Sequence, residues 1–201
     1  MNYLFRKLSL VSSTSGPTLD RVNSNGGDGP TYRQLLAMLD EHLADYELIE
    51  HDPVGTTDVV SALRGHPVAQ AAKCLMLIVK LDRKSKKHVL AVVPGDRKAD
   101  LDSIRGLYQA RYVGFCFCDT ATTERLARAV TGTVLPFALD PDVELVVDPS
   151  VLDQPRLYFN AARLDRSVSL ATADYARIAR PAVHPISTSN ASAEHAGNET
   201  R

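Results

Sequence analysis

Lys73 is a residue whose type and position favour chemistry. It directly precedes the apolar run 74–79 and follows the small residues Ala71 and Ala72. A lysine at the mouth of a buried strand can pack its methylene stem on apolar surface while its ammonium group faces a cleft. The same position suits a lysine that merely reaches solvent from the end of a strand, and the local sequence leaves both interpretations open.

Two later segments could bring backbone groups close to a ligand. Gly132 follows a predicted helix, and Pro136 comes shortly after it. This favours a fixed loop whose backbone N–H groups can bind an oxyanion or a terminal ribose. In the second segment, a predicted strand ends at Asn160 and is followed by Ala161 and Ala162. Such small residues let a ligand approach the backbone. A plain helix end and a plain hairpin are the structural alternatives.

Several enzyme classes lack their motifs in this sequence. There is no Gly-x-Ser-x-Gly, Walker, Gly-x-Gly-x-x-Gly or His-Glu-x-x-His pattern. Cys116 and Cys118 have no second pair at zinc spacing and are interpreted as neighbours on one strand face. We therefore expect no metal and no cofactor. A thiol enzyme based on Cys74, Cys116 or Cys118 is an alternative for which no partnering histidine can be assigned.

The charge balance restricts the partners. Lys and Arg number 23 against 24 Asp and Glu, so the net charge is −1. A protein that grips long nucleic acid usually has a strongly basic face, and a bilayer span needs about 20 apolar residues, so we expect neither DNA nor a membrane as a partner. A short local contact with RNA stays possible. Its candidates are the basic turn residues Arg83, Lys84, Lys86 and Lys87, for which a solvated turn is the other interpretation.

Periodicity predicts alternating helices and strands between residues 31 and 181. Helices are predicted over 31–44, 58–63, 99–108, 120–130 and 172–180, and strands over 47–50, 74–81, 88–93, 112–118, 143–147, 157–160 and 167–170. The charged turn between 81 and 88 makes the second and third strands a hairpin. The predicted fold class is α/β (α+β), a single domain with a mixed, partly antiparallel sheet flanked by helices.

The ends of the chain differ from this central region. Residues 1–30 show no sustained apolar period and are interpreted as a flexible N-terminal extension, and residues 182–201 as a disordered C-terminal tail. The folded unit is predicted over 31–181. Three cysteines are too few for a disulfide framework, which favours reduced thiols and a cytoplasmic location.

In order and spacing, the motifs of residues 31–181 resemble the YbaK-type aminoacyl-tRNA deacylases, relatives of the editing domain of bacterial prolyl-tRNA synthetases. The matching features are His51-Asp52-Pro53, Lys73 before an apolar strand, Gly132 with Pro136, the segment 159–162, Ser167-Val168, and the closing segment 172–179. The resemblance implies a trans-editing hydrolase that cleaves the ester of mischarged aminoacyl-tRNA.

The same resemblance assigns roles to residues. Lys73 would be catalytic, supplying positive charge to the acyl carbonyl or the adjacent phosphate, with backbone N–H groups near Gly132 and Ala161 completing an oxyanion site. The substrate-binding residues would be His51, Gly132, Thr133, Pro136, Phe137, Asn160, Ala161 and Ala162. The partner would be the acceptor end of aminoacyl-tRNA, with a synthetase or elongation factor as a transient partner.

Specificity and activity leave alternatives open. A hydroxyl of the substrate could bond Asn160, so serine and threonine are favoured alongside alanine. Many relatives have glycine at the position of Ala162, and often at that of Thr133. These departures motivate the alternative of a non-catalytic member that binds a tRNA end, a nucleotide or a protein.

Overall fold

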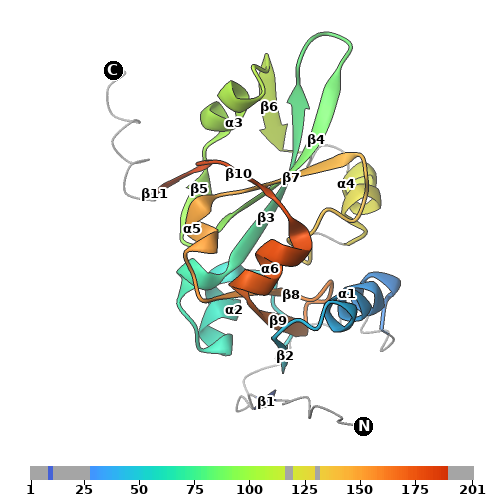
Figure 1. The fold of residues 1–201 in the computed structure, drawn as a ribbon, viewed down its shortest axis with the longest axis vertical. Helices are drawn as coiled ribbons and strands as arrows, with labels where there is room; N and C mark the ends of the chain where they lie inside the picture. Colours follow the sequence, from blue (N-terminus) through green and yellow to red (C-terminus); the bar gives the residue numbers. More distant parts are fainter. Residues whose placement is uncertain (1–8, 11–27, 116–119, 130–131, 190–201) are drawn as a thin grey trace, which may run out of the picture.

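The computed structural model describes residues 9–10, 28–115, 120–129 and 132–189. Helices and strands are mixed along the chain, and most of the strands belong to two main sheets (Figure 1). The predicted mixed α/β class is confirmed, and its sheet is both mixed and partly antiparallel. The structure adds a second sheet that the periodicity did not separate from the first.

The five-stranded sheet has the order β10-β7-β4-β3-β6. Its centre is the predicted hairpin, β3 (Ala72–Lys80) paired antiparallel with β4 (Lys86–Pro94). β6 (Tyr112–Phe115) continues it antiparallel on one side. On the other side β7 (Val143–Val147) and β10 (Ala182–Val183) add parallel pairings. Cys116 and Cys118, predicted for the same strand as β6, lie outside the described residues.

The central strands are continuously apolar because both faces of the sheet are covered. Leu90 and Val92 of β4 belong to one core cluster, whereas Val89, Ala91 and Val93 belong to another on the opposite face. Successive side chains of a strand point to opposite faces, so a strand buried on both sides needs an uninterrupted apolar run. This is why residues 88–93 show no alternation.

The second sheet has four strands in the order β1-β2-β9-β8. β2 (Tyr46–Glu50) and β8 (Arg156–Asn160) both pair antiparallel with β9 (Arg166–Ala171). β1 (Ser9–Leu10) joins β2 in parallel, which places two residues of the predicted N-terminal extension in a sheet. A parallel bridge between Ala71 and Tyr158 connects the start of β3 to β8. The two sheets therefore meet beside Lys73.

The helices are short and partly as predicted. They are α1 (Pro30–Glu41), α2 (Thr57–Arg64), α3 (Leu101–Leu107), α4 (Thr120–Ala127), α5 (Pro149–Leu152) and α6 (Thr172–Ala179), with a 3-10 turn over Val68–Gln70. The 3-10 turn and α5 were not predicted. None of the helices in the described ranges is long and apolar enough to cross a bilayer.

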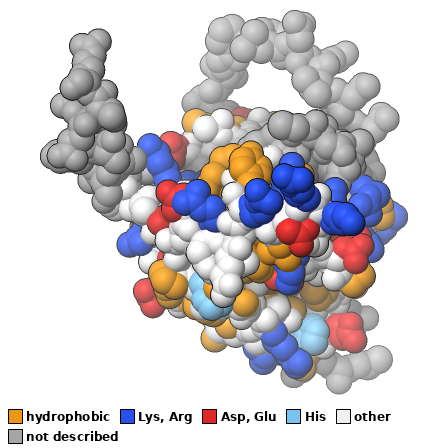
Figure 2. Space-filling model, turned by 90° about the horizontal axis from the view of Figure 1, so that it is seen from above, with side chains coloured by type: hydrophobic (Ala, Val, Ile, Leu, Met, Phe, Trp, Pro, Cys, Tyr) orange, Lys and Arg blue, Asp and Glu red, His pale blue; other side chains and the backbone are white. Residues whose placement is uncertain are grey.

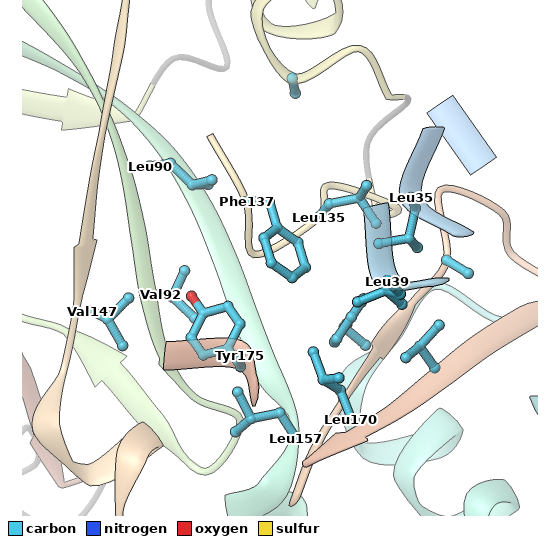
Figure 3. Close-up of a cluster of buried hydrophobic side chains, with 14 of the residues drawn as sticks. Leu35, Leu39, Leu90, Val92, Leu135, Phe137, Val147, Leu157, Leu170 and Tyr175 are labelled. Carbon is cyan, nitrogen blue, oxygen red and sulfur yellow. The ribbon is translucent and has the colours of Figure 1, made fainter. Parts of the chain in front are cut away.

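The larger core cluster fills the space between the two sheets. Tyr175 of α6 is fully buried, and its ring meets Phe137 edge-on with the ring centroids 5.3 Å apart. Figure 3 shows these rings beside Val92 and Val147 of the five-stranded sheet, with Leu170 of the second sheet close by. The Tyr175 hydroxyl donates to the carbonyl oxygen of Pro136 at 2.9 Å. Loop 132–137 is therefore held by the core.

The predicted boundary of the C-terminal tail at residue 182 is wrong. β10 pairs with β7, and β11 (Ser187–Ser189) pairs antiparallel with β5 (Arg97–Ala99). Ile186 is 1% exposed in the second core cluster, and its N–H donates to the buried Asp148 carboxylate at 2.9 Å. The segment is polar in sequence because it needs only one buried apolar anchor, while its backbone hydrogen bonds are supplied by other strands.

Candidate active site

A small cavity opens where the two sheets meet. Its volume is about 110 Å³, and it is lined by residues from four stretches of the chain, among them Thr57, Arg64, Lys73, Gly132, Tyr158 and Asn160. An engineered apolar cavity of roughly 150 Å³ holds a benzene molecule, so the space here suits a group of only a few heavy atoms. Lys73, Gly132 and Asn160, which are far apart in sequence, are thus brought together.

Lys73 is the second residue of β3 and lines the cavity. Its ammonium group donates to the carbonyl oxygen of Gly95 at 3.2 Å and to that of Arg97. An ammonium group has three donors, so one remains for a ligand. Burial lowers the pKa of Lys73 from its usual 10.5, and the carboxylates of Asp58 and Asp96 oppose this change. The side chain is therefore a cation held in place by backbone.

Gly95 explains why the turn that holds Lys73 is so close. A Cβ atom on Gly95 would lie 2.5 Å from the carbonyl oxygen of Val68 and 3.0 Å from Cβ of Ala71. Only glycine allows the β4–β5 turn to pack this tightly against the 3-10 turn. The close approach brings the Gly95 carbonyl within reach of the Lys73 ammonium.

Asn160 lies at the end of β8 with its side chain saturated by the protein. Nδ2 donates to the carbonyl oxygens of Gly132 at 2.9 Å and Val54 at 3.3 Å. Oδ1 accepts from Arg64 and faces the Ser167 hydroxyl at 3.3 Å. The amide therefore ties two loops and α2 to the second sheet. In this structure it has no free donor for a substrate hydroxyl.

Gly132 has a positive φ of +85°, a backbone conformation in which glycine is favoured. Its Cα faces the loop of residue 55, because a Cβ built on Gly132 would lie 3.7 Å from Cα of Gly55. Both glycines line the cavity. The predicted loop is thus present and forms one wall of the site.

His51 does not line the cavity. It is 9% exposed, its Nδ1 lies 2.8 Å from the carbonyl oxygen of Asp52, and its Nε2 lies 2.6 Å from the Ser167 hydroxyl. Burial lowers the pKa of His51, which favours the neutral ring with Nδ1–H donating to Asp52 and Nε2 accepting from Ser167. Ser167 is fully buried. The Ser167 hydroxyl also lies 3.3 Å from Oδ1 of Asn160, so the His51–Ser167 pair contacts this amide on the side away from the cavity.

Thr133, Pro136 and Phe137 also lie outside the lining of the cavity. Thr133 is fully buried, and Phe137 is 5% exposed and packs in the core between the sheets. Pro136 is buried and accepts the bond from Tyr175. The structure places these residues behind the wall that Gly132 and Val134 present.

The expected backbone donor at Ala161 is used elsewhere, which corrects that part of the predicted oxyanion site. Its N–H donates to the carbonyl oxygen of Arg166 at 2.9 Å, closing the β8–β9 hairpin. Ala162 has a φ of +56°, which lies in the left-handed region. This conformation is unfavourable for any L-residue with a Cβ atom. The chain keeps the backbone conformation that glycine favours although alanine occupies the position.

Arg64 is a cavity residue that sequence reasoning missed. It is the last residue of α2, which ends at Gly65 with φ of +72°. Burial lowers the pKa of Arg64 to about 10, so it stays charged at neutral pH. A cation in the last turn of a helix is ordinary because it favours the helix dipole, and no local pattern marks this one as buried.

The basic turn lies at the opposite end of β3 from the cavity, at the top of Figure 1. Seven residue steps separate Lys73 from Lys80, or about 23 Å along a strand. Figure 2 shows Lys and Arg side chains gathered across this end of the molecule. An open hollow of about 470 Å³ is lined there by five cations, one acid and two neutral residues: Lys80, Arg83, Lys84, Lys86, Arg111, Asp82, Ser85 and the half-exposed Tyr112.

Lys87 belongs to another surface than the rest of the turn. It forms an ion pair with Glu144, and its ammonium lies 5.6 Å from the ring centroid of Tyr108. The five cations of the hollow form no ion pair within the described ranges. The structure therefore separates three of the four predicted contacts from the fourth.

Metal and thiol chemistry find no support in the described part of the chain. No three His, Cys, Asp or Glu side chains there are grouped as metal ligands would be. Burial raises the pKa of the Cys74 thiol far above its usual value, so the nucleophilic thiolate is disfavoured.

Known proteins resemble this chain both in sequence and in fold. The sequence profile of a family described as aminoacyl-tRNA editing domain matches residues 51–178, a range that contains the residues lining the cavity. The chain belongs to this family. The resemblance noted from the motifs is thereby confirmed, and with it the expectation that the domain carries the editing fold.

Individual relatives of this editing-domain chain point the same way. The multifunctional Ser/Thr-tRNA deacylase ProXp-y of Escherichia coli K12 is 36% identical over 155 residues, covering 75% of this chain and 89% of that protein. The prolyl-tRNA editing protein ProX of Acetoanaerobium sticklandii is 30% identical over 122 residues, covering 59% and 71%. A solved structure described as a proposed trans-editing enzyme for prolyl-tRNA synthetase shares the fold, with a TM-score of 0.67, 15% identity and coverage of 80% and 98%.

Proposed function

We propose that this editing-domain protein hydrolyses the ester of mischarged aminoacyl-tRNA carrying a small amino acid. The observation that carries the proposal is a cavity of about 110 Å³ with Lys73, Gly132 and Asn160 in its wall, inside a domain of the editing family. The aminoacyl group enters the cavity and the tRNA stays outside. Drug-sized ligands need roughly 300 Å³ or more, so the cavity admits only one small end of a larger substrate.

The reaction needs no nucleophilic side chain. A water molecule attacks the ester carbonyl carbon, the bond from that carbon to the ribose oxygen breaks, and a proton from the water passes to the ribose oxygen. The products are the free amino acid and the tRNA. The remaining donor of Lys73 stabilises the negative charge that develops on the carbonyl oxygen. In other enzymes, removing one such donor costs roughly 3–4 kcal/mol of transition-state stabilisation.

Serine and threonine are the amino acids we favour, with alanine as the smaller alternative. The Escherichia coli relative is named for Ser- and Thr-tRNA. In this chain the hydroxyl contact would come from a group other than Asn160, whose amide is occupied. Thr57 and Tyr158 are polar residues of the same cavity wall and are the candidates for that contact.

The acceptor stem of the tRNA would reach the basic hollow at the far end of β3. Its five cations have no ion pairs in the described ranges and outnumber the single carboxylate of the lining, Asp82, so the hollow attracts phosphates. We keep a synthetase or elongation factor as a transient partner and the cytoplasm as the location. A pull-down from cell extract with and without charged tRNA, and fractionation, would test these two predictions.

The direct test is deacylation of tRNAs charged with Ser, Thr, Ala, Cys or Pro by the full chain. We expect hydrolysis of the Ser, Thr or Ala esters and its loss in Lys73→Ala. The matched control is Lys98→Ala, an exposed lysine of β5 that does not line the cavity, which should retain activity. Full activity of a folded Lys73→Ala variant would refute the role of this lysine.

A non-catalytic binder is the second candidate, motivated by Ala162 and Thr133 where many relatives have glycine. The structure weakens this motive because position 162 keeps its left-handed backbone and Thr133 is buried away from the cavity. Binding of uncharged tRNA without hydrolysis of any of the five esters would favour the binder.

A further inference from the structure

Arg64 is a partly buried charge that has no counter-ion among the described residues. Within the described ranges its guanidinium group donates one hydrogen bond, to Oδ1 of Asn160. Its Nε is buried and has no hydrogen-bond partner. A buried cation is costly unless an anion compensates it, and a guanidinium group carries five donors. The side chain therefore has both charge and donors left for a ligand.

The cavity that Arg64 lines is positive. Lys73 is its second cation, and no Asp or Glu is among the lining residues within the described ranges. Lys73 already spends two donors on the carbonyl oxygens of Gly95 and Arg97. Such a wall disfavours the α-ammonium of an amino acid ester and favours oxygen atoms of the substrate. Two cations allow two oxygen groups to be held at once.

The phosphodiester beside the terminal ribose is the fixed anion nearest the ester in an aminoacyl-tRNA. Guanidinium groups match phosphate because parallel N–H donors meet two oxygens, whereas an ammonium acts as a point charge. Arg64 is also partly exposed, as a residue that meets the outer part of the substrate must be. We infer that Arg64 binds the phosphate of the terminal nucleotide, while Lys73 serves the carbonyl. This assignment rests on the proposed function for the identity of the nucleotide.

The test is equilibrium binding of adenosine 5′-monophosphate and of adenosine, measured by calorimetry on the full chain. We expect the monophosphate to bind about tenfold or more tightly, as a charge-assisted contact predicts. Arg64→Gln should bring the two affinities together without weakening adenosine. Arg64→Lys should keep part of the preference. Arg105→Gln is the control, since Arg105 is an exposed residue of α3 paired with Asp102.

Each outcome decides the inference. Equal affinities in the unmodified chain, or a phosphate preference that survives in folded Arg64→Gln, would overturn it. A preference that disappears in Lys73→Met but persists in Arg64→Gln would transfer the phosphate to Lys73 and overturn it as well. If Arg64→Gln lowers only kcat of deacylation, the arginine acts on the oxyanion instead. Because binding requires no turnover, failure of the deacylase assay leaves this result separately readable.

Discussion

The side-chain amide of Asn160 holds the carbonyl oxygen of Gly132 at 2.9 Å, across 28 residues of sequence. This single bond fixes the loop of residue 132 to the end of β8. The same amide accepts a hydrogen bond from Arg64 of α2. Three walls of the cavity thus depend on one side chain, and Asn160 is a positioning residue.

Removing the Asn160 amide should therefore disrupt the cavity. Asn160→Ala leaves the Gly132 carbonyl and the Arg64 guanidinium without this partner, and removing a hydrogen-bonding side chain that is itself buried costs about 1–3 kcal/mol. We expect kcat/KM for deacylation to fall at least about tenfold with a lower melting temperature. Asn160→Asp keeps an acceptor for Arg64 but loses both donors, so it should be nearly as inactive. Wild-type kinetics in either variant would contradict the role.

Ala162 carries a strain that glycine would relieve. Its φ of +56° costs an L-residue about 1–2 kcal/mol, while glycine adds unfolded-state entropy worth about 0.4–1 kcal/mol. We expect Ala162→Gly to raise the free energy of unfolding by about 0.5 kcal/mol, measured by urea denaturation. Ala161→Gly is the control, because Ala161 is fully buried and is not among the residues with positive φ, so this variant should be less stable. Destabilisation by Ala162→Gly would contradict the argument.

The Lys73 ammonium should set the alkaline limit of activity. Burial lowers the pKa of Lys73, and the protonated form is the one that donates to the carbonyl oxygen. Activity is therefore full below this lowered pKa and falls as the pH rises through it, at a lower pH than an exposed lysine with its usual 10.5 would cause. The measurement is a pH profile of kcat, corrected for spontaneous ester hydrolysis. A rate that keeps its plateau to the highest accessible pH would count against Lys73 as the donor.

The hairpin surface offers a comparison of charges within one turn. Arg83→Glu and Lys84→Glu change cations of the hollow that form no ion pair within the described ranges. Lys87→Glu changes a lysine that is already paired with Glu144. We expect the first two to raise KM for charged tRNA without changing kcat. Each should also reduce the slope of log affinity against log salt by about one. Lys87→Glu should leave the salt slope near that of the unmodified chain. Equal effects of all three would mean that the surface acts only through bulk charge.

Much of the local structure could be predicted from the sequence. The β3–β4 hairpin follows from two apolar runs around a charged turn, and α1, α2 and α6 follow from helical spacing and terminal signals. These features depend on neighbours within a few residues, where periodicity and turn chemistry act. Segments 97–99 and 187–189 were missed because they are short and polar, and each is a strand only because it pairs with the other.

The sequence by itself determined the family, the position of Lys73 directly before an apolar run, and the order of the motifs. Only the tertiary structure decided which of those residues face the cavity. It placed His51 and Phe137 behind the wall, used the N–H of Ala161 within a hairpin, and brought Arg64 to Asn160 across 96 residues. The physical reason is that a hydrogen bond between distant segments depends on how two sheets pack, and no local pattern of residue types encodes that packing.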